Sequence, residues 1–170
     1  LHGYCENLLY ERTNNPYDLG RSPMGSSGGA GAIVAASGTA FDIGSDTGGS
    51  VRIPAHATGV GGLTRTAGRI AGKGHIISYD TFDQALTTLG PLARYVEDLE
   101  TILFVIAGSD GIDPFAYDLP IGESRATDVA RLSVAFYSDN GTAMPVASID
   151  EAVRQAAKRL ANAGARVEER

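Results

Sequence analysis

The stretch GSDTGGSVRIPA, residues 44–55, places a serine directly after two glycines. Glycine permits sharp turns and close backbone approach, so consecutive N–H groups in this stretch can converge on one point. The donors concerned are those of Thr47, Gly48, Gly49 and Ser50. A hydroxyl beside such donors suits acyl transfer, because the serine can attack a carbonyl while the N–H groups hold the resulting oxyanion. A glycine-rich turn with an incidental serine remains the alternative.

Two residues of opposite charge flank Ser50. Asp46 precedes the glycine pair and Arg52 follows the serine. We expect them to form an ion pair that holds the loop, which is structural support rather than chemistry. The glycines make residues 44–55 a poor candidate for an ordinary strand or helix.

A second serine-rich segment is MGSSGGAGA, residues 24–32. Ser26 and Ser27 precede a glycine run and an expected helix start, where backbone N–H groups favour anions. A phosphate-binding loop is one interpretation, although no lysine follows as in a P-loop and the spacing misses G-x-G-x-x-G. A plain helix N-cap is the other interpretation. These residues alone leave both open.

Other features narrow the class of protein. His2, His56 and His75 have no metal-ligand spacing, and we predict neither a metal nor a cofactor. The single cysteine, Cys5, excludes an internal disulfide framework and fits a reducing compartment. A net charge of −6 with scattered Lys and Arg argues against a general nucleic-acid or membrane-surface binder. No apolar run can span a bilayer, and the first residues lack a signal-peptide layout, so we expect a cytoplasmic protein.

Hydrophobic periodicity predicts the elements that must position these residues. They are a buried helix from Gly28, a short strand over 40–44, loops with short strands over 56–90, a helix over 95–107, a strand over 132–137, a last helix and a final strand. Ser148 and Glu151 have the spacing of a capping box for the last helix, and Gly164 ends it. Helices alternating with short apolar strands indicate an α/β fold.

Three segments together resemble the amidase signature family, whose members are serine hydrolases that cleave carboxamides. They are SSGGAGA, GSDTGGSVRIPA and GVGGLTRTAGR, in that order. The resemblance continues in NNPYDLGRSP, in TTLGPLARYVEDLETILFVIAGSD and in PVASIDEAVRQAAKRLANAGARVEE, and so covers nearly the whole chain. It implies an α/β fold with a mixed sheet core flanked by helices. Residues 1–170 would be part of a single domain, lacking an N-terminal lysine region and a C-terminal remainder.

The resemblance also implies roles for individual residues. Ser50 matches the nucleophile, and Ser26 matches a second serine that follows a cis peptide, here Gly25–Ser26. A neutral lysine would draw the proton from Ser50 through Ser26. The N–H groups of Thr47, Gly48, Gly49 and Ser50 match the oxyanion hole. Structural support would come from Gly25, Ser27, Asp46 and Arg52.

The chain departs from the family pattern at three places. The family lysine lies upstream of the first serine, whereas the lysines of this chain, Lys73 and Lys158, both lie downstream of Ser26. Met24 stands where the family usually has glycine, and Thr64-Arg65 replaces Lys-Pro in the loop GLKPT. We therefore expect a carboxamide hydrolase as the parent protein and an inactive isolated chain, because a serine without a base is a weak nucleophile.

Other functions remain open. An amidotransferase A-type subunit would release ammonia from glutamine for a partner, but such relatives usually carry Gln where this chain has Ile53. That residue favours a stand-alone enzyme acting on a small-molecule amide. A non-catalytic remnant that serves as a binding module is the second alternative. Tyr79 and Phe82 are candidates for the pocket lining.

Overall fold

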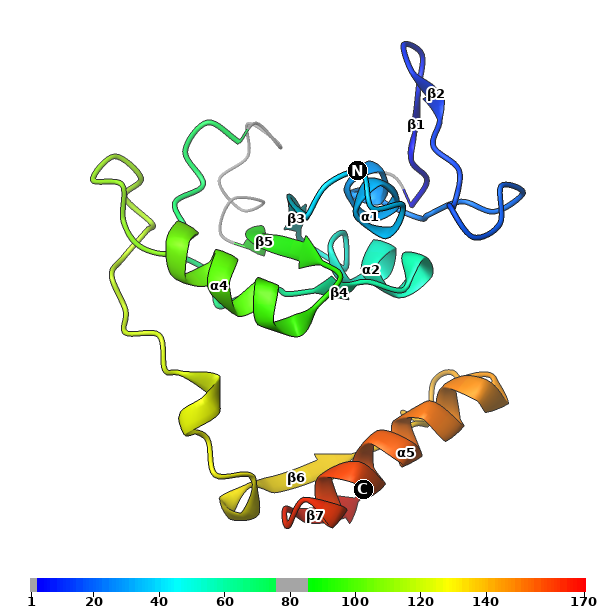
Figure 1. Ribbon diagram of the computed structural model, residues 1–170, viewed down its shortest axis with the longest axis vertical. Coiled ribbons are helices and arrows are strands. Elements are labelled where there is room, and N and C mark those ends of the chain that lie inside the picture. Colours follow the sequence, from blue (N-terminus) through cyan, green and yellow to red (C-terminus); the bar gives the residue numbers. More distant parts are fainter. Residues whose placement is uncertain (1–2, 76–85) are drawn as a thin grey trace. The chain divides into compact units, whose positions relative to one another are not determined.

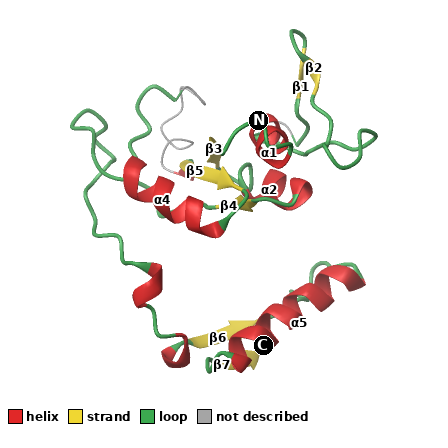
Figure 2. Ribbon diagram, viewed as in Figure 1, coloured by secondary structure: helices red, strands yellow, loops and turns green. Residues whose placement is uncertain are grey.

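The computed structural model describes residues 3–75 and 86–170. Tyr79 and Phe82 lie outside the described residues. The chain divides into two compact units, Leu1–Ile121 and Gly122–Arg170. Figure 2 shows helices and strands in both units, which confirms the α/β class.

The first unit is built around a three-stranded antiparallel sheet in the order β3-β5-β4. Strand β3 spans Phe41–Asp46, β5 spans Thr88–Ala93 and β4 spans Gly61–Gly62 (Figure 1). Strand β3 pairs with β5 along its whole length, with Gly44 opposite Gly90 and Asp46 opposite Thr88. This pairing brings together segments that lie far apart in the sequence.

Helices cover both faces of β5. Leu92 packs with Val51, which lies directly before α2 (Arg52–Thr58), and with Ala55 within that helix. The next residue, Ala93, packs with Leu99 and Ile102 of α4 (Val96–Ile106). Successive side chains of a strand point to opposite faces, so α2 and α4 lie on opposite sides of the sheet.

Helix α1 (Gly28–Ala35) begins at Gly28, as predicted, and packs closely against α2. A Cβ atom on Gly31 would lie 3.0 Å from the Thr58 hydroxyl, so the small residue permits this close packing. A two-stranded hairpin precedes α1, formed by β1 (Glu6–Asn7) and β2 (Glu11–Arg12).

We predicted that residues 44–55 form neither an ordinary strand nor an ordinary helix. This prediction was wrong at both ends of the segment. Strand β3 continues to Asp46 because each of its residues pairs with one of β5. Helix α2 begins at Arg52 and tolerates Pro54, which lies in its first turn where a backbone N–H has no partner within the helix. The irregular part is residues 47–51.

The helix predicted over 95–107 is α4, and Gly108 follows it with a φ of 120°. The second unit holds the 3-10 turns Ser124–Ala126 and Val129–Arg131, then β6 (Ser133–Phe136), α5 (Ala147–Asn162) and β7 (Arg166–Glu169). Strands β6 and β7 pair in parallel. No helix among the described residues is long and apolar enough to cross a membrane.

The predicted capping box of α5 was wrong. The N-cap residue is Val146, and no side chain caps the helix. The N–H groups of Ile149 and Asp150 both donate to the Val146 carbonyl, so the first turn closes before Ser148 can act as a cap. Gly164, with a φ of 100°, follows the end of the helix as predicted.

Candidate active site

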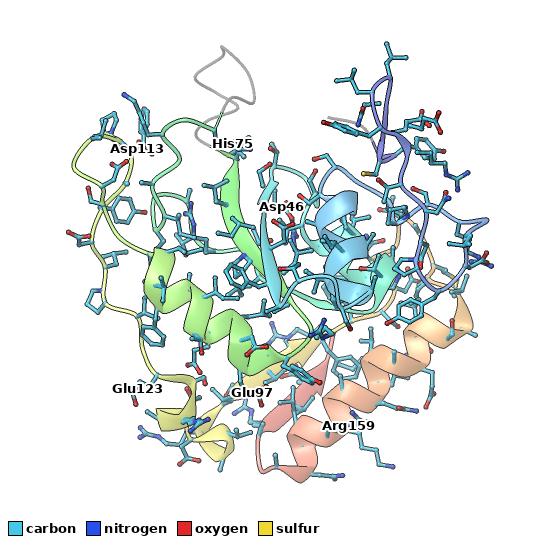
Figure 3. All side chains as sticks on the ribbon, turned by 45° about the horizontal axis from the view of Figure 1, so that its top comes forward. Asp46, His75, Glu97, Asp113, Glu123 and Arg159 are labelled. Carbon is cyan, nitrogen blue, oxygen red and sulfur yellow. The ribbon has the colours of Figure 1, made fainter. Side chains whose placement is uncertain are left out.

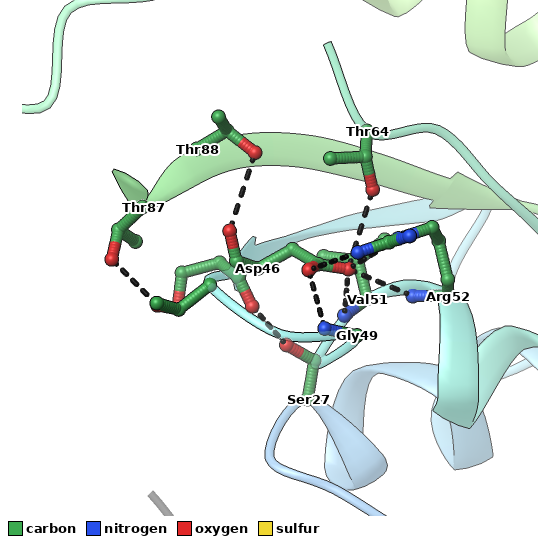
Figure 4. A network of polar contacts seen from close by, with 10 residues as sticks. Ser27, Asp46, Gly49, Val51, Arg52, Thr64, Thr87 and Thr88 are labelled. Atoms are coloured by element: carbon green, nitrogen blue, oxygen red, sulfur yellow. Dashed lines mark hydrogen bonds and ion pairs between the residues drawn. The ribbon is translucent and has the colours of Figure 1, made fainter. Parts of the chain in front are cut away.

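Asp46 is the centre of a hydrogen-bond network at the end of β3 (Figure 4). Its side chain is buried, at 1% exposure, and it accepts the Gly49 N–H at 2.6 Å and the Val51 N–H at 3.0 Å. The Arg52 guanidinium binds both carboxylate oxygens, at 3.1 Å through Nε and 2.9 Å through Nη2. The Arg52 N–H and the Thr64 hydroxyl add bonds of 3.2 and 3.3 Å. The carboxylate thus fixes both ends of the loop that carries Ser50.

This network keeps Asp46 ionised. Burial by itself raises the pKa of a carboxyl group, because a charge is less stable away from water. The bonds from the Arg52 side chain and from the backbone N–H groups of Val51, Gly49 and Arg52 outweigh burial and hold the pKa of Asp46 well below its usual range. The predicted ion pair between Asp46 and Arg52 is confirmed.

The two serine motifs meet through the backbone. The N–H of Ser27 donates to the carbonyl oxygen of Ser50 at 3.1 Å, and the Ser27 hydroxyl donates to the Ser45 carbonyl at 3.5 Å. The peptide bond between Gly25 and Ser26 is cis. Ser26 is therefore the direct neighbour of Ser27, which is hydrogen-bonded to the segment that carries Ser50.

Gly44 makes this approach possible. It is buried in β3, and a Cβ atom built on it would overlap the Ser27 hydroxyl and approach Val51 Cγ2 to 3.0 Å. Any side chain at position 44 would push Ser27 away from the strand.

Ser26 and Ser50 are both partly exposed residues. Neither hydroxyl forms a hydrogen bond with another described residue. Both are thus free to bond to each other, to a base or to a ligand. Lys73 forms no hydrogen bond to either serine within the described part of the chain.

The four backbone donors expected beside Ser50 do not behave alike. The Gly49 N–H points at the Asp46 carboxylate, a shorter and stronger bond than a neutral acceptor would give, so it is committed within the protein. The N–H groups of Thr47, Gly48 and Ser50 make no hydrogen bond to a described residue. These three remain as candidate donors to an oxyanion.

Three threonines outside the loop, Thr64, Thr87 and Thr88, support it, and the sequence motifs did not reveal their role. The Thr47 and Thr87 hydroxyls bond at 2.6 Å, the Thr88 hydroxyl donates to the Asp46 carbonyl at 3.4 Å, and Thr64 binds the Asp46 carboxylate (Figure 4). Thr87 and Thr88 reach the site through the pairing of β3 with β5. Thr64 could be noticed in the sequence as a departure from GLKPT, but its contact with Asp46 could not.

No group of three or more His, Cys, Asp or Glu side chains in the described ranges has a geometry that could hold a metal ion. The polar groups around Ser50 are instead hydroxyls, backbone N–H groups and one ion pair. This set of groups suits nucleophilic attack on a carbonyl and stabilisation of the oxyanion that forms.

Comparisons relate this chain to known proteins. The family model described as Amidase matches residues 1–170. The A-type subunit of the glutamyl-tRNA(Gln) amidotransferase of Roseiflexus sp. (strain RS-1) is 38% identical over 167 residues, which are 96% of this chain and 34% of the relative. A solved structure of fatty acid amide hydrolase is 32% identical with a TM-score of 0.88, covering 100% of this chain and 30% of that one.

A solved structure of 6-aminohexanoate cyclic dimer hydrolase, complexed with substrate, is 33% identical with a TM-score of 0.86. The match covers 99% of this chain and 36% of that chain. The present chain thus spans about a third of the length of these similar proteins.

Proposed function

Because the chain belongs to the amidase signature family, we propose that its parent protein hydrolyses a carboxamide C–N bond through an acyl-enzyme on Ser50. The observation that carries the proposal is the bond from the Ser27 N–H to the Ser50 carbonyl, which joins the two serine motifs. The fatty acid amide and cyclic dimer hydrolases, similar to this chain over nearly all its length, support the reaction class.

In this mechanism the Ser50 hydroxyl oxygen attacks the amide carbonyl carbon while its proton passes to Ser26. Ser26 in turn gives its own proton to a base. The carbonyl oxygen becomes an oxyanion, which the free N–H groups of Thr47, Gly48 and Ser50 can stabilise. When the tetrahedral intermediate collapses, the C–N bond breaks and the amine leaves with the proton. Water then hydrolyses the Ser50 ester and returns the serine to its starting state.

Asp46 acts in this scheme as a positioning residue. It binds the backbone on both sides of Ser50 and has its charge balanced by Arg52. Its low pKa and its ion pair make it a poor proton acceptor, so we assign it no proton-transfer role. Asp46 thus holds the loop, while the N–H groups of Thr47, Gly48 and Ser50 form no hydrogen bond with a described residue.

In this proposal the base is neither Lys73 nor Lys158. We propose a lysine from a segment upstream of Leu1, and we expect the isolated chain to lack amidase activity. Without a base the Ser50 hydroxyl remains a weak nucleophile, whatever the quality of the oxyanion site.

The test is an aryl-amide hydrolysis assay on the full-length parent protein. Ser50→Ala should abolish turnover, and Ser26→Ala should lower kcat by about 10²–10⁴-fold, the range for loss of a proton-transfer group. Ser148→Ala, an exposed serine on α5, is the matched control and should leave the rate unchanged. Hydrolysis that survives Ser50→Ala would reject the proposal, and a parent protein inactive on all amides would favour a non-catalytic binding module.

A second candidate is a protein that supplies ammonia from glutamine to a partner. The similarity to the A-type subunit of glutamyl-tRNA(Gln) amidotransferase favours it. Ile53, where such relatives usually have Gln, favours the stand-alone enzyme. A glutaminase assay on the parent protein separates them: ammonia release from glutamine that depends on Ser50 would support the amidotransferase role.

A further inference from the structure

A cavity of about 380 Å³ lies in the first unit. Its lining includes Arg65, Lys73, His75, Thr87, Asp113 and Phe115. Two contacts connect it with the loop: Thr87 binds the Thr47 hydroxyl at 2.6 Å, and Thr64, next to Arg65, binds the Asp46 carboxylate. A molecule in this cavity would therefore lie next to the loop that presents Ser50.

Arg65 is the partly buried cation of this cavity. Its Nη1 donates to the Thr66 carbonyl at 2.7 Å and its Nη2 to the Ile70 carbonyl at 2.9 Å. Its Nε is buried and has no hydrogen-bond partner, and no described carboxylate forms an ion pair with the side chain. The Asp113 carboxylate and two neutral carbonyls interact with the partly buried guanidinium, but its Nε still lacks a hydrogen-bond acceptor.

Among the described residues of the lining, cations outnumber carboxylates. Lys73 adds a second cation, and Asp113 is the carboxylate of the described lining. Asp113 is engaged with the backbone, since it accepts the Gly72 N–H at 2.7 Å and the Phe115 N–H at 2.9 Å. Figure 3 labels Asp113 and His75 of the lining, together with Asp46 at the end of β3. Clefts with one dominant sign of charge attract ligands of the opposite sign.

We propose that the amide substrate of this site carries a carboxylate, which binds in the cavity beside Arg65 and Lys73. The proposal rests on the proposed function, because it names the substrate class of the same site. Arg65 supplies a planar cation that suits a carboxylate, Lys73 adds charge at the exposed rim, and apolar side chains such as Phe115 contact the chain between carboxylate and amide.

The experiment measures binding separately from turnover. The half-anilides of succinic and adipic acid, each paired with its neutral methyl ester, are titrated by calorimetry into the full-length Ser50→Ala parent. We expect at least one acid to bind about tenfold or more tightly than its ester, the scale expected for a partly buried charge pair. Arg65→Gln should remove that preference, and Lys73→Gln should reduce it severalfold.

Lys158→Gln is the matched control, because Lys158 lies on α5 in the second unit and should keep the full preference. Lys73 is exposed, so its substitution tests the proposal even if Arg65→Gln impairs folding. Equal binding of acid and ester, binding of neither, or a preference that survives both substitutions would overturn the proposed carboxylate site. Failure of amide hydrolysis in the serine-intact parent would instead reject the proposed function, so the two failures are distinguishable.

Discussion

The backbone N–H of Ser27 donates to the carbonyl oxygen of Ser50 across 3.1 Å. This bond ties the segment after the cis Gly25–Ser26 peptide to the loop between β3 and α2. It requires Ser27 to lie directly against β3, at the position of Gly44. The relative placement of the two candidate catalytic serines therefore depends on a residue that has no side chain.

Gly44→Ala should be destabilising and should also reduce activity. The added methyl group overlaps the Ser27 hydroxyl in a buried place, and overpacking of this kind costs about 1–3 kcal/mol. Displacement of Ser27 also shifts Ser26, and misplacing a reacting group by about 1 Å can cost 10²-fold in rate. Urea unfolding and kcat/KM of the full-length protein measure the two effects.

Gly29→Ala is the control for this substitution. Gly29 is exposed on α1, and a Cβ atom there would meet nothing within 4 Å. Alanine is the better helix former, so the variant should be equal to or more stable than the wild type by up to about 1 kcal/mol. A Gly44→Ala protein with wild-type stability and rate would show that Ser27 does not need this close approach.

Asp46→Asn should lower the free energy of unfolding by about 2–3 kcal/mol at neutral pH, because buried donors lose a charged acceptor. The exposed Arg52 side chain can return to water, which keeps the cost below that of a fully buried pair. Urea unfolding measures the change. Asp98→Asn, in the exposed first turn of α4, is the control; it removes only a surface charge near the helix N-terminus and should cost less than about 1 kcal/mol.

The contribution of Asp46 should depend on pH in a definite direction. Its pKa is lower in the folded protein than the value of about 3.9 expected in the unfolded chain. The stabilisation is therefore fully present above that unfolded value and is lost as the pH falls toward the folded one. The gap in unfolding free energy between wild type and Asp46→Asn should be constant above about pH 5 and shrink below about pH 4. A gap that widened on acidification would contradict the low pKa.

The sequence predicted the local features of this site better than the long-range ones. Helices α1 and α4 follow from apolar spacing and from their glycine signals, and the Asp46–Arg52 pair follows from proximity along the chain. Local sequence patterns could not predict the contact of Thr87 with Thr47, because this contact depends on the pairing of β3 with β5.

For two predictions drawn from motifs, the structure shows a backbone N–H group hydrogen-bonded to a different acceptor than the motif suggested. Ser148 matches a capping box by spacing, and Gly49 matches an oxyanion donor by position. In each case a backbone group has a nearer partner: the Val146 carbonyl closes the first turn of α5, and the Asp46 carboxylate takes the Gly49 N–H. A motif gives the residue types of a site, whereas the choice between competing acceptors depends on three-dimensional distance.

Met24→Gly should make the protein more stable. Met24 has a φ of 61°, in the left-handed region that costs a residue with a side chain roughly 1–2 kcal/mol. Glycine relieves this cost but adds freedom to the unfolded chain, so the net gain should be about 0.5–1 kcal/mol. Met144→Gly is the control, since Met144 is exposed and has no positive φ, and it should bring no gain. Equal melting temperatures for wild type and Met24→Gly would show that the turn accommodates a side chain at no cost.

Gly48 and Gly49 are neighbours that should respond differently to alanine. Gly49 is buried with a φ of 124°, which an L-residue rarely adopts, and a Cβ atom there would lie 2.6 Å from Ile53 Cδ1. The Ile53 side chain can shift, but the backbone cannot keep this φ without strain of about 1–3 kcal/mol. Gly49→Ala should therefore lower stability by that amount and also lower kcat, because the Gly49–Asp46 bond orients the loop.

Gly48→Ala is the internal comparison. Gly48 is exposed, has no positive φ, and would place a Cβ atom in open space, so stability should change by no more than about 0.5 kcal/mol. Alanine also keeps the N–H that is a candidate oxyanion donor. Urea unfolding and kcat measured on both variants separate the two glycines. Equal losses at both positions would mean that the whole loop, rather than the Gly49–Asp46 contact, sets its conformation.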